Sequence, residues 1–383
     1  MQLLTRKTIF LFLFSFFTIL SSIAYCNTLT ENKDSLTINH GDSLKSNVKE
    51  EFNPGVMIME HIGDNHEWHI ITIGDTHVSI PLPVILYDNG TINIFSSSNF
   101  HHGSTSYKGY KIETTGENNG KIVKVKTDGY TTDNNASKPL DFSITKNVLS
   151  LFISFFIICW LFISIANSYK KRKGHAPKGI QSLLEPIILF IRDDIAIPSI
   201  GTKRYERFMP FLLTLFFFIF INNLMGLIPF FPGGANLTGN IAVTMVLALI
   251  TFFITNITAN KSYWKHIINT PGVPWWLKFP LPLMPIVEIM SLFTKPFVLM
   301  IRLFANITAG HIITLGFISL VFIFGNMNVY LGYGISIISV LFSVFMGLLE
   351  LLVAFLQAYV FTLLSALYFG MAIVEEHEPA HKK

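Results

Sequence analysis

Long stretches without formal charge constrain the fold of this chain more than any other feature of its sequence. Residues 208–260 contain no Asp, Glu, Lys or Arg, and residues 283–324 and 331–374 contain four such side chains between them. A helix of about 20 apolar residues spans the hydrocarbon core of a membrane. Charged residues make up 14% of the chain, against ~25% in typical soluble domains. The sequence therefore predicts an all-α polytopic membrane protein and excludes an ordinary cytosolic enzyme.

The basic residues indicate membrane topology rather than nucleic-acid binding. The formal net charge is +4, and nine of the 28 Lys and Arg residues lie between positions 170 and 207, directly after an apolar segment. Such a cluster marks the cytoplasmic end of a membrane span. We therefore expect no nucleic-acid partner and a chain embedded in the lipid bilayer.

The N-terminus has the order of a secretory signal peptide. A short basic start precedes an apolar stretch and small residues, which predicts a signal peptide over 1–26 with cleavage after Ala24 or Cys26. Two alternatives are an uncleaved first membrane helix and a lipid anchor at Cys26. The other cysteine, Cys159, lies in an apolar segment, so we expect no structural disulfide.

Residues 27–145 are predicted to form a small β-rich extracytoplasmic domain. Alternating segments such as 69–73 and 91–95 are separated by turn-forming pairs such as Asn89-Gly90, which is typical of hairpins. A metal site is one interpretation of the histidines here, but their spacing matches no known ligand pattern. We favour surface histidines and expect no metal or other cofactor. The seven histidines are His40, His61, His66, His69, His77, His101 and His102.

The positions of charges and helix breakers predict five transmembrane helices. Residues 147–169 form one span that leads to a cytoplasmic basic loop at 170–207, in which 180–197 is an amphipathic helix. Each of the last two segments would be about 63–66 Å long as one helix, twice the membrane core, so each either folds as two spans or forms one long tilted helix. We favour the long tilted helices, because no strong turn signal interrupts 312–323 or 341–366. The remaining segments are a transmembrane hairpin at 208–260, a cytoplasmic loop at 261–282, two long tilted membrane helices at 283–324 and 331–374, and a cytoplasmic tail at 375–383.

Polar side chains inside the two long segments are the candidate functional residues. Glu288, Lys295 and Arg302 are spaced by seven residues, so on a helix they share one stripe. Asn306, four residues beyond Arg302, joins this face. Charged groups within membrane spans are costly and usually mark ion or proton pathways. His311, Glu350 and Gln357 are further polar residues in these apolar segments.

Several of these residues lie in runs that resemble subunit a of the F-type rotary ATP synthase. The similarity covers about residues 185–375, and its most specific feature is Arg302-Leu-Phe-x-Asn306 with Leu-Gln-Ala downstream. The β-rich domain lies outside it. The runs that carry the resemblance are Pro296–His311 (PFVLMIRLFANITAGH), Leu356–Phe361 (LQAYVF), Pro210-Phe211, Asn223–Pro229 (NLMGLIP) and Asn236–Thr238 (NLT).

The resemblance implies the proton-channel stator subunit of an ATP synthase, a subunit that does not itself bind nucleotide. Its partners would be the c-subunit ring, whose carboxylate faces Arg302, the peripheral-stalk b subunits and, indirectly, the soluble ATPase head. The location would be the bacterial cytoplasmic (inner) membrane, with the N-terminal domain in the periplasm and the C-terminus in the cytoplasm. Arg302 would be the essential arginine with Asn306 on its face, Glu288 would line the half-channel towards the cytoplasm, and Asn223, His311, Glu350 and Gln357 would line the outer half-channel.

The chain departs from the family pattern at several positions. Many bacterial members have Glu and His where this chain has His311 and Glu350, so the pair is exchanged while its chemistry is retained. Gly226 replaces a common acidic residue, and Ala305 replaces a glycine. The exchange affects the expected polarity of the outer half-channel most directly.

Two other classes of function are alternatives. The tail contains His377-Glu378-Pro379-Ala380-His381, which matches H-E-x-x-H, but Pro379 opposes the helix that zinc binding requires. The zinc content of the purified chain would test such a metalloenzyme. A self-contained secondary transporter would show internal repeats with paired broken helices, and the sequence shows no convincing repeat.

Overall fold

The structure is a computed structural model that describes residues 53–73, 76–113, 118–126, 131–133, 136–172, 175–228, 231–268 and 283–373. The predicted signal peptide, Cys26, His40 and the tail with its H-E-x-x-H match lie outside these residues. The chain divides into two compact units. The first unit comprises residues up to 150, 228–236 and 308–348, and the second comprises 151–227, 237–307 and 349–383.

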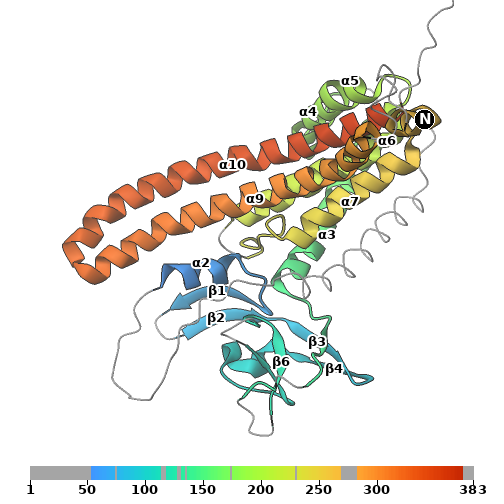
Figure 1. Cartoon of the computed structure of the whole chain (residues 1–383). Coiled ribbons are helices and arrows are strands. Elements are labelled where there is room, and N and C mark those ends of the chain that lie inside the picture. Colours follow the sequence, from blue (N-terminus) through green and yellow to red (C-terminus); the bar gives the residue numbers. More distant parts are fainter. Residues whose placement is uncertain are drawn as a thin grey trace, which may run out of the picture. The chain divides into compact units, whose positions relative to one another are not determined.

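Five helices in the described part of the chain are long and apolar enough to cross a membrane (Figure 1). This number agrees with the prediction from the sequence. Two of them contain 45 residues each, about 67 Å at ~1.5 Å per residue. They therefore exceed the ~30 Å hydrocarbon core and fit it only when inclined or partly outside it. The five helices are α3 (Lys146–Lys171), α6 (Tyr205–Leu227), α7 (Ile241–Thr258), α9 (Leu283–Met327) and α10 (Val329–Ile373).

Aromatic side chains hold the helices of the second unit together. Phe162 of α3 packs edge-on against Phe217 of α6, with ring centroids 5.2 Å apart. Phe208 of α6 stacks on Phe369 of α10 at 4.9 Å. Within the most apolar 18-residue stretch of each helix, 56% of α6 is buried inside the protein, whereas only 6% of that stretch is buried in α9 and 11% in α10. The helix α6 is therefore the core of this bundle, whereas α9 and α10 present most of their surface outward.

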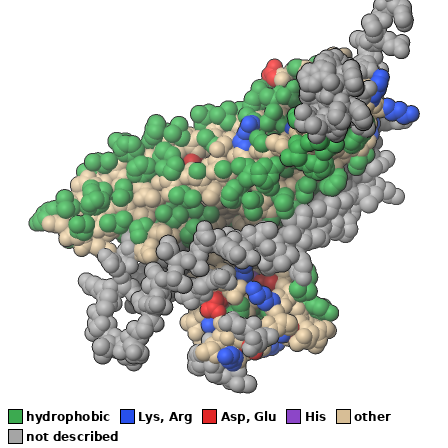
Figure 2. All heavy atoms as spheres, in the orientation of Figure 1, with side chains coloured by type: hydrophobic (Ala, Val, Ile, Leu, Met, Phe, Trp, Pro, Cys, Tyr) green, Lys and Arg blue, Asp and Glu red, His purple; other side chains and the backbone are tan. Residues whose placement is uncertain are grey.

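Figure 2 shows the same contrast on the molecular surface, where hydrophobic side chains cover most of the visible face of the long helices. Charged side chains are visible on the small β-rich domain and near one end of the helical part. An apolar outer surface of this kind suits lipid or another membrane subunit.

The carboxyl end of α10 is tied to two other segments of the second unit. The side chain of Asn260 donates to the carbonyl oxygen of Ile373 at 2.8 Å, and its backbone N–H donates to that of Ala372 at 2.9 Å. Arg204 adds a third hydrogen bond, to Ile373 at 3.0 Å. These bonds satisfy carbonyl groups that a helix end leaves without partners, and the guanidinium also complements the negative end of the helix dipole.

A glycine near the same end of α10 allows close contact with a short helix. The predicted amphipathic segment forms α4 (Ile180–Phe190), a π-helical turn (η3, Ile191–Ala196) and α5 (Ile197–Ile200). A Cβ atom at Gly370 of α10 would overlap the carbonyl oxygen of Ser199 in α5. The backbones meet here without room for any side chain.

In the first unit, α9 and α10 meet at a tighter turn than the sequence predicted. The sequence placed the two helices at 283–324 and 331–374, but Asn328 is the single residue between them. Its side chain accepts a hydrogen bond from the backbone N–H of Tyr330 at 2.9 Å, which caps the start of α10. Gly332 allows the close approach, because a Cβ there would lie 2.7 Å from the Cα of Gly325.

The sequence predicted a β-rich N-terminal domain, and the structure contains one. This domain belongs to the first unit. The hairpin β3–β4 turns at Asn89 and Gly90, which both have positive φ, as a type I′ turn requires. Val84, Leu86 and Phe100 are fully buried in its core. The elements are α2 (Pro54–Ile62), β1 (Glu67–Ile73), β2 (Thr76–Pro81), β3 (Pro83–Asp88), β4 (Thr91–Ser96), β5 (Tyr110–Ile112), β6 (Ile122–Lys124) and β7 (Leu140–Asp141), paired as β1–β2, β4–β3–β7 and β5–β6.

Two histidines of this domain pair with carboxylates. His66 lies 2.7 Å from Asp141, and His102 lies 2.7 Å from Glu67. Burial alone would raise the pKa of Asp141, but hydrogen bonds from His66 and Ser143 outweigh it and hold the pKa below its ordinary value. No three His, Cys, Asp or Glu side chains come together as a metal site within the described residues.

A substitution at Gly370 tests the close packing of α10. Gly370→Ala is expected to lower the thermal unfolding midpoint of the purified protein in detergent, since overpacking costs about 1–3 kcal/mol. Gly347→Ala in the same helix is the control, because nothing lies within 4 Å of a Cβ there. An equal midpoint for the two variants would contradict this contact.

Candidate functional site

The predicted arginine lies on an outward face of α9. Arg302 and Asn306 are both exposed, and the neighbouring Val298 and Ile301 are also exposed, by 43% and 38%. No carboxylate in the described part of the chain pairs with Arg302. A permanent charge therefore lies uncompensated on an apolar surface, which is costly in a membrane without a partner or water.

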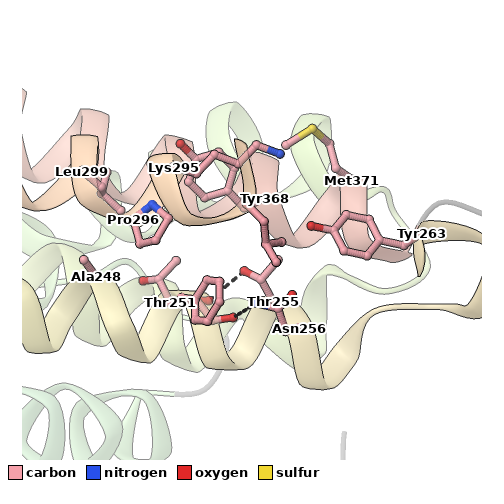
Figure 3. Close-up of a pocket in the computed structure, with 12 residues that line it drawn as sticks. Ala248, Thr251, Thr255, Asn256, Tyr263, Lys295, Pro296, Leu299, Tyr368 and Met371 are labelled. Atoms are coloured by element: carbon pink, nitrogen blue, oxygen red, sulfur yellow. Dashed lines mark hydrogen bonds between the residues drawn. The ribbon is translucent and has the colours of Figure 1, made fainter. Parts of the chain in front are cut away.

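Lys295 lies seven residues before Arg302 on the same stripe of α9, and its side chain is directed inward. Its ammonium nitrogen lies 5.7 Å from the ring centroid of Tyr368 in α10. Figure 3 shows both residues at a cavity with Thr255 of α7 and Tyr263 of α8 (Lys261–Ile268). The cavity holds about 20 Å³, which is room for one water molecule. The two cations of the stripe therefore have different surroundings.

Electrostatic contacts connect Glu288 to this cavity. Burial, followed by the carboxylate of Glu288, raises the pKa of Tyr263 above its ordinary value. Arg302 acts electrostatically on Tyr368. Tyr263, Lys295 and Tyr368 line the cavity, and Glu288 and Arg302 act on its two tyrosines from outside its lining.

Sequence reasoning did not identify the two tyrosines or the polar residues of α7 as part of this site. Tyr263 and Tyr368 lie in segments that are far apart in the sequence, and tyrosine is common in membrane proteins at positions without any special role. The presence of Thr251, Thr255 and Asn256 within six residues of an apolar helix was the available signal. All three line the cavity.

Asn223 ties α6 to α10 in the second unit. Its side-chain nitrogen donates to the carbonyl oxygen of Ala354 at 3.1 Å, and its side-chain oxygen accepts a hydrogen bond from the Thr238 hydroxyl at 2.6 Å. Ala354 lies between Glu350 and Gln357 at spacings of four and three residues, which places all three on one face of α10. The structure therefore joins Asn223 to α10 between the positions of Glu350 and Gln357.

The predicted pairing of His311 with Glu350 is not tested by the structure. His311 belongs to the first unit and Glu350 to the second. Both side chains are half-buried in long apolar helices. The pairing therefore stays a prediction.

A substitution at Thr238 tests the hydrogen bonds of Asn223. Asn223 and Thr238 are only 3% and 1% exposed, so Thr238→Val leaves the buried Asn223 oxygen without its donor. Such a loss costs about 1–3 kcal/mol, and the thermal unfolding midpoint in detergent is expected to fall. Thr238→Ser keeps the hydroxyl and is expected to stay near the unsubstituted midpoint. Equal midpoints for the Val and Ser variants would show that this bond contributes nothing.

Comparison with known proteins assigns separate families to the two parts of the chain. Residues 148–370 match the family described as ATP synthase A chain, and residues 57–142 match a domain of unknown function (DUF8433). The chain is 44% identical over 256 residues to ATP synthase subunit a of Chloroherpeton thalassium, which covers 63% of this chain and 72% of that protein.

Two other relatives match this chain over a region of similar length. The chain is 45% identical over 245 residues to ATP synthase subunit a of Chlorobium phaeobacteroides, covering 62% of this chain and 68% of the relative. It is 42% identical over 244 residues to the protein of that name from Myxococcus xanthus, covering 62% and 75%. With its five membrane helices and its matched region of more than half its length, the chain belongs to the ATP synthase A chain family.

Proposed function

We propose that this chain is the proton-channel stator subunit of a rotary ATP synthase, in which Arg302 faces the carboxylates of a ring of c subunits. The exposed, uncompensated guanidinium on α9 is the observation that supports this role most directly. A charge of this kind costs about 2.5–3.5 kcal/mol near the centre of a membrane helix. A carboxylate on a neighbouring subunit compensates this cost when it passes Arg302.

The chemistry of the two groups explains how ring rotation is coupled to proton flow. A protonated carboxylic acid crosses lipid at small cost, whereas the ionised form is expensive there. Arg302 keeps its proton at any accessible pH, so it favours the ionised carboxylate in front of it and promotes release of the proton. Its fixed charge also separates the two half-channels. Each proton that crosses 100 mV supplies about 2.3 kcal/mol for rotation.

On the cytoplasmic side, Glu288 begins the proposed half-channel. The series of polar groups through Tyr263, Lys295 and Tyr368 supports a path that runs from this carboxylate towards Arg302. A water molecule in the cavity beside Lys295 would extend the series, because hydroxyl groups and water both donate and accept hydrogen bonds.

On the outer side, the half-channel is assigned to Asn223, His311, Glu350 and Gln357. Asn223 lies beside the face of α10 that carries Glu350 and Gln357. A histidine exchanges its proton near physiological pH, and a carboxylate can share that proton with it. Asn306, exposed one helical turn beyond Arg302, is an uncharged hydrogen-bonding group on the same face.

The partners and the location follow from this assignment. The c-subunit ring contacts the Arg302 face, the peripheral-stalk b subunits hold the chain still, and the soluble ATPase head carries the nucleotide chemistry. The basic cluster after α3 marks the cytoplasmic side. The β-rich domain is then periplasmic, the C-terminus is cytoplasmic, and the whole chain lies in the bacterial inner membrane.

The first test is Arg302→Lys in the assembled complex. We expect normal assembly but loss of coupled proton transport, because an ammonium lacks the planar fork and can lose its proton. ATP-driven acidification of membrane vesicles measures this activity. Pumping at the unsubstituted rate would refute the assigned role of Arg302. Lys295→Arg is a matched exchange on the same helix, and it is expected to keep much of the pumping because it preserves the charge.

A second test exchanges the outer pair. Each single variant, His311→Glu or Glu350→His, is expected to slow ATP-driven pumping. The pair then consists of two carboxylates or of two imidazoles, and an acid no longer faces a base. The double exchange is expected to recover a large part of the rate if the two side chains share a proton. A double variant no faster than the slower single variant, in a normally assembled complex, would disprove the pairing.

A further inference from the structure

The segment between α2 and β1 attaches the N-terminal domain to the first turn of α3. The two carboxylate oxygens of Asp64 accept hydrogen bonds from the backbone N–H of Asn147 at 3.0 Å and from the Thr145 hydroxyl at 2.9 Å. The carbonyl oxygen of Asn65 accepts one from the backbone N–H of Lys146 at 2.9 Å. Two of these bonds satisfy N–H groups that the start of a helix leaves open.

A second contact joins the same domain to the loop between α6 and α7. Trp68 of β1 is only 2% exposed, and its ring packs edge-on against Phe231 at a centroid distance of 5.2 Å. Residues 228–236 of this loop belong to the first unit together with the domain. The domain is therefore fixed at two places on the membrane part of the chain.

The segment that leads from β7 into α3 is itself bonded to the sheet. The backbone N–H of Phe142 donates to the carbonyl oxygen of Ile85 in β3 at 2.8 Å. The N–H of Ile85 donates in turn to the hydroxyl oxygen of Ser143 at 3.0 Å. Lys146, the first residue of α3, is four residues beyond Phe142, a distance of at most ~14 Å along the chain. The sheet is therefore held close to the start of a membrane helix.

One face of this sheet carries apolar side chains although it points away from the core of the domain. The hairpin β3–β4 lies at one side of the domain (Figure 1). Leu86 of β3 is fully buried, and side chains alternate between the two faces of a strand. The outer face therefore includes Tyr87, Ile92 and Ile94, which are exposed by 42%, 66% and 64%. The register pairs Tyr87 with Ile92 and Ile85 with Ile94, so these side chains lie next to one another.

The two charged residues of strands β3, β4 and β7 lie on the other face. Asp88 accepts a hydrogen bond from the Tyr110 hydroxyl at 2.8 Å and forms an ion pair with Lys124 at 2.7 Å. Asp141 pairs with the partly covered ring of His66. An antiparallel sheet with one face in water is normally polar on that face. The reversed pattern here marks the outer face as a surface for a protein or a membrane.

The position of this outer face favours lipid. Phe142 follows Asp141 and therefore lies on the same face as Tyr87, and its side chain is exposed by 52%. The chain enters α3, a helix long and apolar enough to cross a membrane, directly after Phe142. Headgroup regions extend the ~30 Å hydrocarbon core of a bilayer to ~40–45 Å, so a surface held at the start of such a helix lies beside one of them. Tyrosine is enriched in this region of membrane proteins.

We infer that the outer face of the β4–β3–β7 sheet lies on the membrane surface, with Tyr87, Ile92 and Ile94 inserted among the lipid headgroups and the upper acyl chains. Interfacial helices insert their apolar faces by ~5–10 Å, and a similar depth covers these three side chains. The inference goes beyond the proposed function and does not depend on the role of Arg302. It gives the N-terminal domain a lipid contact in addition to its two attachments.

The test uses the full-length chain in the assembled complex, reconstituted in phosphatidylcholine liposomes. Both native cysteines are replaced by alanine, and a single new cysteine, Ile94→Cys, carries a fluorescent label. We expect iodide on both sides of the membrane to quench this label several-fold less than a label at Asn119→Cys, an exposed position between β5 and β6. Lipids with a nitroxide on the headgroup are expected to quench the Ile94 label strongly and the Asn119 label weakly.

Two results would overturn the inference. Equal quenching by iodide at the two positions would show that the face is in water. A label at Ile94 that is protected from iodide but not quenched by the nitroxide lipids would show that protein covers the face instead.

A pair of double variants tests the contribution of the two isoleucines, with the label at Tyr87→Cys. Ile92→Asn with Ile94→Asn is expected to raise iodide quenching of this label to the level at Asn119, because burial of an amide without a hydrogen bond is costly. Ile92→Leu with Ile94→Leu is the matched control of similar size, and it is expected to keep the protection. Protection that persists in the Asn variant would contradict insertion of these side chains.

Discussion

The cost of leaving polar groups without partners in hydrocarbon determines most of this structure. Backbone groups inside a membrane must be satisfied within the chain, which requires long helices. The same cost explains the ends and the interior of α10, where Asn260 and Arg204 bind the last carbonyl groups and Asn223 binds that of Ala354. Against this background the exposed guanidinium of Arg302 is an exception. No carboxylate among the described residues pairs with it, and this is why the proposed function gives this face a partner subunit.

The different surroundings of the two cations on α9 strengthen this conclusion. Lys295 is covered by the ring of Tyr368 and a small polar cavity, so its charge is already partly compensated within the chain. Arg302 is two helical turns further along the same helix and has no such cover. Phenylalanine rings pack α6 against α3 and α10 in the same unit. In the proposed function, Arg302 is the fixed charge that a carboxylate of the ring meets as it passes.

The sequence predicted the features that depend on local patterns. Uncharged length identified the five helices, and the Asn89-Gly90 turn identified a hairpin of the β-rich domain. The seven-residue spacing placed Lys295 and Arg302 on one stripe, but it could not show that one would be covered and the other exposed, since this depends on Tyr368 in α10. The cavity residues Tyr263 and Thr255 were missed for the same reason. The connection between α9 and α10 is shorter than expected because Asn328 caps α10, and a single asparagine is a weak signal in a sequence.

The attachment of the N-terminal domain shows how such a domain can be added to a membrane subunit without changing its helices. The first turn of any helix has N–H groups without intrahelical partners, and at a membrane surface they need ligands from nearby. Asp64 and Asn65 supply hydrogen-bond acceptors to N–H groups at the start of α3. The ring of Trp68 packs against Phe231 in the loop between α6 and α7. The hydrogen bonds and the ring contact of this attachment involve a helix start and a loop, whereas other residues pack α3, α6 and α10 together. A domain attached in this way can change its own side chains without altering the ring packing of these helices.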